Sequence, residues 1–197
     1  MSEQGKELRF EGIVRAFGYG DGDQGKQFLG AIIECSDGKV WVIDYDEQSP
    51  FHAFADRQVV VSGEPYEPSG QHLIGWRGGQ KPGHFRVSMM RLVEVSSDAA
   101  LVEVGPGHHL SGRFEHGTSD TVESKLSFVT QKGATFLVAN DPAGATAGSS
   151  VEVWAYLVQP SPLTRRSPGQ YLWIICPYSA KDLWDWRGRS RRGLSVR

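Results

Sequence analysis

The sequence predicts a mostly β protein built from two similar modules in tandem. Short apolar runs that alternate with polar residues recur along the chain, and this period-2 spacing is typical of strands. Glycine and proline number 24 and 10 among 197 residues, a content that fits many short strands joined by turns. One order of elements also occurs twice, in residues 8–95 and again in residues 108–178.

Each copy opens with an apolar residue, a spacer and a glycine, in residues 10–12 and 110–112. A polar stretch and a strand pair follow, and the pair turns at Asp37-Gly38 in the first copy and at Lys132-Gly133 in the second. A glycine at such a turn indicates a hairpin, because glycine has no Cβ to forbid positive φ.

Trp41 and Phe136 follow the two turns at the same strand phase, so we expect both to face inward at equivalent sites. Fourth strands are predicted over residues 59–63 and 151–155, and aromatic residues open the last strands. In the first copy Ser49 precedes Pro50, which predicts the cap and first residue of a short helix reaching Asp56.

Five short strands with a helix between the third and the fourth resemble the oligonucleotide/oligosaccharide-binding (OB) fold. The resemblance rests on this element order and on the Val59-x-Val61-x-Gly63 pattern of the fourth strand. It implies two tandem five-stranded antiparallel OB-like barrels with one or two short helices. The second copy departs from the pattern, because it has Ala155 in place of Gly63 and lacks a clear helix. An SH3-like or split-barrel module fits the same patterns almost as well.

The predicted organisation has four segments. A first barrel spans 1–95 and a linker spans 96–107, where glycine and proline suit a boundary. A second barrel spans 108–186 and ends in a latch from Ser179 to Trp186, and a basic tail covers 187–197.

Hydropathy argues against a membrane-spanning or secreted protein, and the charged residues are unevenly distributed along the chain. No apolar run approaches the roughly 20 residues that span a bilayer, and residues 1–7 lack the apolar region of a signal peptide, so we expect a cytoplasmic protein. The formal net charge is −2, but residues 1–104 hold 10 Lys/Arg against 16 Asp/Glu, and residues 105–197 hold 11 against 7. The first module is therefore acidic, and the basic charge is concentrated at the end of the chain.

No catalytic motif or cofactor-binding motif stands out. Asp44, Asp46 and Glu47 with nearby His52 have the residue types for acid/base work, but they equally fit a solvated strand end and a first helical turn. The glycine-rich stretch 18–25 precedes a predicted strand rather than a helix, which argues against a phosphate loop. We expect no cofactor.

A metal site is not expected either. His108 and His109 are neighbours on a predicted strand and would point to opposite faces, and His116 brings no carboxylate or cysteine at ligand spacing. Cys35 and Cys176 each lie in an apolar run and are expected to be buried thiols.

The most informative segment for function is residues 71–82, which combines exposed aromatic, aliphatic and basic residues in a glycine-rich loop. Trp, Tyr and Arg are enriched at protein-interface hot spots, while rings and cations also suit single-stranded nucleic acid. Trp76 could instead fold back as a lid on its own barrel. The predicted partner-binding residues are Phe17, Tyr19, Leu73, Ile74, Trp76, Arg77, Lys81, Arg165 and Arg166.

The function expected first is a non-catalytic binding or adaptor protein, accessory or inhibitor-like, that presents these loops to a protein partner. The alternative is single-stranded nucleic-acid binding through the second barrel and the tail residues Arg187, Arg189, Arg191 and Arg192. An enzyme with no recognisable motif ranks third. The acidic first module decides the order, because nucleic-acid binders usually carry a basic stripe across the fold. No membrane association is expected, and a homodimer is possible.

Overall fold

Strands make up most of the structure, and the chain divides into two units. The computed structural model describes residues 7–21, 26–44, 46, 48–67, 82–117, 126–142, 144–163 and 169–175, and only the backbone of 17–21 and 26–29. The first unit comprises Met1–Ala99 with Glu103–Gly105, and the second comprises Ala100–Val102 with Pro106–Arg197. No helix in the described ranges is long and apolar enough to cross a membrane.

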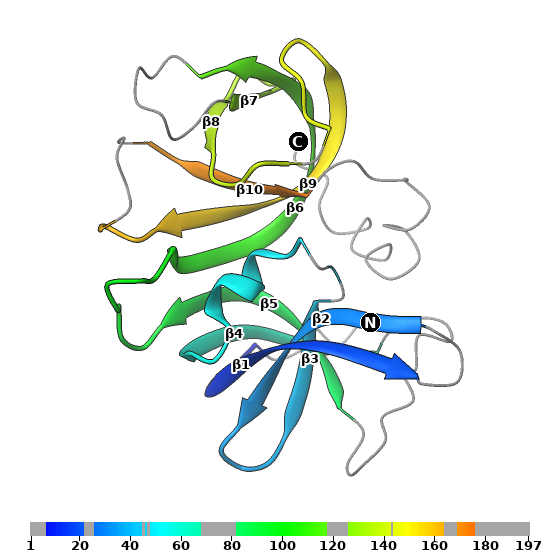
Figure 1. Ribbon diagram of the computed structural model, residues 1–197, viewed down its shortest axis with the longest axis vertical. Helices are drawn as coiled ribbons and strands as arrows, with labels where there is room; N and C mark the ends of the chain where they lie inside the picture. Colours follow the sequence, from blue (N-terminus) through cyan, green and yellow to red (C-terminus); the bar gives the residue numbers. More distant parts are fainter. Residues whose placement is uncertain are drawn as a thin grey trace. The chain divides into compact units, whose positions relative to one another are not determined.

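The first unit is a closed barrel of five strands (Figure 1). The strands are β1 (Leu8–Asp21), β2 (Lys26–Cys35), β3 (Val40–Asp44), β4 (Gln58–Tyr66) and β5 (Gly83–Leu92). Around the ring β1 pairs with β2, β2 with β3, β3 with β5, β5 with β4, and β4 with β1.

The expectation of a wholly antiparallel barrel is wrong, because β3 and β5 run parallel, with Trp41 opposite Gly83 and Val42 opposite His84. The reason is geometric. A closed ring with an odd number of strands cannot alternate in direction all the way round, so at least one neighbouring pair must be parallel. The other four pairings of this ring are antiparallel.

The predicted short helix begins where expected, between β3 and β4, but it is a 3₁₀ helix, η1 (Pro50–Phe54), that ends before Asp56. Ser49 caps it, and its Oγ accepts a hydrogen bond of 3.3 Å from the Phe51 backbone N–H. Proline occupies the first helical position, where its missing N–H is not needed. Phe51 and Phe54 are buried, so η1 contributes two aromatic rings to the interior.

Trp41 packs inside the first barrel, as the strand phase predicted. Its ring stacks on Phe10 with the centroids 6.3 Å apart and lies 5.5 Å from the ring of fully buried Phe85. Gly83 permits this position, because a Cβ there would lie 2.4 Å from the Trp41 ring. The three rings, from β1, β3 and β5, form one aromatic cluster in which Phe85 is fully buried and Phe10 and Trp41 are half-buried.

The second unit contains β7 (Leu126–Thr130), β8 (Thr135–Val138), β9 (Ser150–Pro160), β10 (Tyr171–Ile175) and most of β6 (Leu101–His116), whose residues Glu103–Gly105 belong to the first unit. Antiparallel pairs join β6 to β7, β7 to β8 and β9 to β10, while β8 and β10 run parallel. β6 also pairs with β9. The segment expected as a linker, 96–107, therefore includes the first residues of a strand, because β6 begins at Leu101.

The two hairpin turns, β2–β3 and β7–β8, have the same backbone geometry. Gly38 has φ 82° and Gly133 has φ 83°. Each glycine N–H donates to the carbonyl of the residue that ends the preceding strand, at 3.0 Å to Cys35 and 2.9 Å to Thr130. Both turns thus need a residue without a Cβ at the same place.

The core of the second unit is apolar, and Phe136, the second residue predicted to face inward, packs against it. Its fully buried members include Phe114, Phe128 and Ile174, and Phe136 on β8 packs against this core. The Phe114 and Phe128 rings meet edge to face with their centroids 5.4 Å apart. Phe136 is paired with Phe128 just as Trp41 is paired with Ile33, two residues before the end of the preceding strand in each case.

Candidate functional site

The structure places only two of the predicted partner-binding residues. Phe17 and Tyr19 lie on β1 opposite Gly30 and Phe28 of β2, and their side chains are outside the described part. The others lie outside the described residues: Leu73, Ile74, Trp76, Arg77, Lys81, Arg165 and Arg166, with the tail residues Arg187, Arg189, Arg191 and Arg192. The structure does describe the strand ends that flank the connecting segments in which the loop residues lie.

Residues 67–82 connect β4 to β5, and a cluster of four polar and aromatic side chains lies where they join. In this cluster, named here the Tyr66 cluster, Tyr66 is opposite His84 and Glu64 is opposite Arg86. Phe85 and Val87 are buried, which puts the intervening Arg86 on the outer side of the strand.

The rings and charges of the Tyr66 cluster are in contact. The Tyr66 and His84 rings meet edge to face with centroids 5.7 Å apart. The Arg86 guanidinium carbon lies 5.2 Å from the Tyr66 centroid, within cation–π range, and Arg86 also forms an ion pair with Glu64. His84 is buried, whereas the Arg86 side chain is 47% exposed.

This arrangement suits recognition better than catalysis. An arginine laid over a tyrosine gives a flat surface with hydrogen-bond donors at its rim, which is a common feature of protein interfaces. Sequence reasoning missed the cluster, because Tyr66 and Arg86 are 20 positions apart and meet only through the strand register. The signal available was a tyrosine ending one strand and a histidine and an arginine opening the next.

The acidic and histidine cluster after β3 makes backbone contacts that shape the chain. Asp44 is buried, and its Oδ1 accepts the Asp46 N–H at 3.1 Å. Asp46 Oδ1 in turn accepts the Gln48 N–H at 2.8 Å. The His52 Nε2 contacts the Asp46 backbone carbonyl, 3.1 Å away, so Nε2 carries a proton there. These contacts shape the turn into η1. The expected solvated strand end and acidic first helical turn are wrong, because Asp44 is buried and the first turn of η1 holds no acidic residue.

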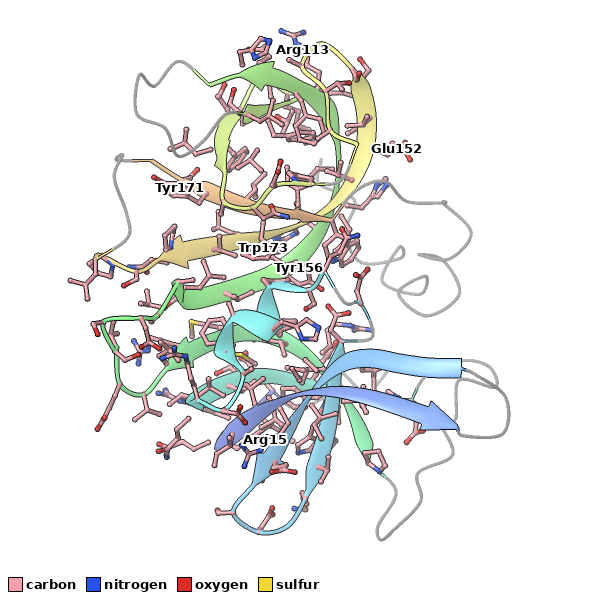
Figure 2. The ribbon with its side chains drawn as sticks, in the orientation of Figure 1. Arg15, Arg113, Glu152, Tyr156, Tyr171 and Trp173 are labelled. Carbon is pink, nitrogen blue, oxygen red and sulfur yellow. The ribbon has the colours of Figure 1, made fainter. Side chains whose placement is uncertain are left out.

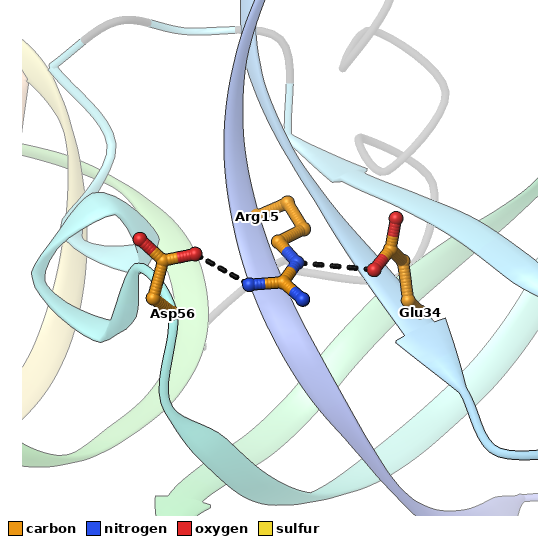
Figure 3. Close-up of polar contacts among 3 residues, drawn as sticks. All are labelled: Arg15, Glu34 and Asp56. Atoms are coloured by element: carbon orange, nitrogen blue, oxygen red, sulfur yellow. Dashed lines mark hydrogen bonds and ion pairs between the residues drawn. The ribbon is translucent and has the colours of Figure 1, made fainter.

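A second polar network, on the outside of β1, ties three elements together (Figure 3). The Arg15 Nε donates to Glu34 Oε2 at 3.0 Å, and Nη1 donates to Asp56 Oδ1 at 2.5 Å. The bond to Glu34, followed by the one to Asp56, raises the pKa of Arg15 above its ordinary value. Asp56 has φ 60°, and it links the end of η1 to β4. The network is structural, because it ties β1 to β2 and to the segment between η1 and β4.

The second unit has an open groove of about 400 Å³ on the outside of β6, β7 and β9. Its lining includes Gly112, Gly133, Arg113 and Glu152, and Figure 2 labels the two charged residues. Both charges already have partners, since Arg113 pairs with Glu115 at 2.7 Å and Glu152 lies 3.4 Å from His109 Nε2. The groove has a mixed polar and apolar lining without a concentrated charge.

Aromatic residues also line the side of β9 and β10 that faces away from the core. Leu172 and Ile174 belong to the core, so Tyr171 and Trp173 lie on the opposite face of β10. Trp173 is opposite Tyr156 of β9 (Figure 2), and the Tyr156 ring meets that of Trp154 edge to face at 6.3 Å. Tyr156, Tyr171 and Trp154 are largely buried.

The described residues contain no group of three or more histidine, cysteine or acidic side chains that could hold a metal ion. His108 is half-buried, and desolvation lowers the pKa of its imidazole below the ordinary value. Comparison with protein-family models, with curated proteins and with solved structures found no match.

Proposed function

We propose that this chain is a non-catalytic binding protein that presents the β4–β5 segment of an OB-like barrel to a protein partner. The observation that carries the proposal is the Tyr66 cluster, in which an exposed arginine covers a tyrosine at the base of that segment. The segment itself adds Trp76 and Arg77, the residue types that dominate interface hot spots.

The strand order supports the OB-like part of the proposal for the first unit. In the OB fold five strands close into a barrel in the order 1-2-3-5-4, and its strand 4–5 loop flanks the binding face. β1 to β5 pair in that order, and η1 lies between β3 and β4.

Three equivalences support a second barrel of the same kind. The pairings of β6 to β10 follow the same order, including the parallel pair of third and fifth strands. The two hairpin turns share their glycine and their hydrogen bonds. Asp56 and Gly148 both have positive φ, and each donates its N–H to the second residue after a matching glycine, at 2.8 Å to Val14 and 2.7 Å to Phe114.

The ion pairs of the described residues favour a protein over a nucleic acid. Binding to phosphates needs cations that are free to replace counterions. Five of the described cationic side chains are already paired with carboxylates of this chain: Arg15, Lys39, Arg57, Arg86 and Arg113. With the acidic balance of residues 1–104, this leaves few unpaired cations among the described residues of the first barrel.

Affinity capture from native lysate, with and without nuclease, tests the proposal. The bait is compared with Trp76→Ala, Arg86→Ala and the control Val95→Ala, a change at a 52% exposed side chain outside the Tyr66 cluster. We expect one protein to be captured after nuclease treatment, and its affinity to fall by about 2 kcal/mol in Trp76→Ala at an unchanged melting temperature. If Trp76 is a lid on its own barrel, the melting temperature falls instead.

Nucleic-acid binding through the tail is the second candidate, motivated by five arginines among the last eleven residues. Titration of a fluorescent single strand at low and near-physiological salt measures it, with the intact chain and with a chain ending at Trp186. We expect weak binding that disappears with the tail. About four phosphate contacts would give a slope near −3 in log affinity against log salt. Submicromolar affinity at near-physiological salt that survives the truncation would make nucleic acid the first choice.

A further inference from the structure

The outer face of β1, β4 and β5 carries a pattern of apolar and charged residues that is complementary to itself. Three residues of β1, three of β4, two of β5 and Val93, which directly follows β5, form this face, named here the β1–β4–β5 face. They lie in three rows across the strands: Arg9, Ser62 and Met89; Glu11, Val60 and Arg91; and Ile13, Gln58 and Val93.

The strand register establishes that these nine residues share one side of the sheet. Their neighbours along the strands, such as Val59, Val61 and Met90, are fully buried, so the alternate positions face outward. Three of the outward residues are large apolar side chains with substantial exposure, since Ile13 is 37%, Met89 42% and Val93 42% exposed. Together with half-buried Val60, these three residues form an apolar surface between the charged residues of the face.

The charges occupy opposite sides of β4. In the middle row Glu11 and Arg91 flank Val60, one on β1 and the other on β5. Glu11 accepts a hydrogen bond from Gln58, and Arg91 makes no ion pair with the described part of the chain. Glu11 and Arg91 thus lie at the same level on either side of β4, and on the other side of β5 Glu103 of β6 is opposite Arg91.

We propose that the β1–β4–β5 face is the contact surface of a homodimer. In this dimer two copies pack face to face. The two-fold axis that relates them lies between the two faces and runs parallel to β4. The axis exchanges the β1 side with the β5 side. Glu11 of the first copy therefore meets Arg91 of the second, and Arg91 of the first copy meets Glu11 of the second. Val60 then meets Val60 of the second copy, and Ile13 meets Val93.

Self-complementarity is what selects a second copy over another protein. A two-fold interface uses the same patch on both subunits, so each residue must suit the residue that the axis brings opposite to it. The middle and lower rows meet this condition with an ion pair and with apolar contacts. Sheets that pack face to face keep their strands within about 30° of each other, which allows these rows to match.

The size of the face implies a weak dimer. Strands lie about 4.8 Å apart and rise about 3.4 Å per residue, so three strands over five residues cover far less than the roughly 800 Å² per partner of a standard interface. We therefore expect association in the range of tens to hundreds of micromolar. This face ends at Ser62, at the bulge between Ser62 and Gly63, and the Tyr66 cluster lies beyond it. Self-association and capture of a partner are thus separable.

Sedimentation velocity across about 5 µM to 1 mM, with the full chain, tests the proposal. Glu11→Arg and Arg91→Glu each bring like charges together, and we expect each to weaken the dimer at least tenfold. The double variant Glu11→Arg/Arg91→Glu restores the opposite charges and should recover most of the affinity. The control Leu163→Arg, which introduces an arginine at a 68% exposed residue of the second unit, should leave association unchanged.

Circular dichroism melting confirms that each variant is folded before its association is measured. Concentration-dependent dimerisation that both single variants weaken and the double variant restores supports the proposal. A wild-type chain that stays monomeric at 1 mM overturns it. So does a dimer that neither single variant weakens, or that the double variant does not restore, since its contact surface must then lie elsewhere.

Discussion

Replacement of Trp41 by alanine tests the inner packing of the first barrel. The ring lies in a cluster with Phe10 and buried Phe85, at 6.3 and 5.5 Å between centroids. Large-to-small changes of aromatic core residues cost about 3–5 kcal/mol, and the partial exposure of Trp41 places it at the lower end. We expect the free energy of unfolding to fall by about 3 kcal/mol, measured by urea denaturation followed by far-ultraviolet circular dichroism.

Gly83 provides the matched partner for a double-mutant cycle. A Cβ there would lie 2.4 Å from the Trp41 ring, so Gly83→Ala alone should cost about 1–3 kcal/mol through overpacking. In the Trp41→Ala background the ring is gone, and the same change should cost much less. Coupling energies between contacting residues are about 0.5–3 kcal/mol. Additive costs, or a Trp41→Ala cost below about 1 kcal/mol, would show that the indole does not pack against Gly83.

Three further changes test other parts of the fold. Gly112→Ala should destabilise the second unit by about 1–3 kcal/mol in urea, because its Cβ would lie 2.3 Å from the Val129 carbonyl oxygen; an unchanged midpoint contradicts this contact. Asp56 has φ 60°, so Asp56→Ala should lower the free energy of unfolding by about 1–2 kcal/mol, and Asp56→Gly should lower it clearly less. Equal losses in the two variants would mean that the lost contact with Arg15, rather than the backbone conformation, causes the effect. Burial lowers the pKa of His108 below 6.5, so the unfolded chain binds the proton more readily and stability falls as pH drops through about 6.5. Melting curves from pH 8 to pH 5 should show a smaller loss in His108→Gln, and an identical loss would assign the pH dependence to other groups.

Features that depend on a few neighbouring residues could be predicted from the sequence. The glycines of the two turns, the Ser49-Pro50 helix start and the inward phase of Trp41 and Phe136 are each decided within a few residues, and the structure confirms them. The mostly β class follows from the same short-range patterns. Each depends on a property that a residue carries with it, such as a missing Cβ or a fixed φ.

Features that depend on distant partners were not predictable in the same way. The parallel pairing of β3 and β5 follows from closing a ring of five, which no alternation of apolar residues encodes. The Tyr66 cluster needs the register of β4 on β5, and a bulge between Ser62 and Gly63 shifts that register by one residue. Most of the predicted binding residues lie outside the described residues, so their role stays a prediction.

The parallel closure also sets the order in which the first barrel can be completed during synthesis. β5 pairs with β4 on one side and with β3 on the other, so it is the strand that closes the ring. Until it emerges from the ribosome, β3 and β4 each retain an open edge, and open edges are templates for pairing with other chains. A nascent or truncated chain that ends before Gly83 should therefore aggregate or recruit chaperones, and extension to Leu92 should relieve this. The latest strand of the barrel is thus the one that protects the earlier ones.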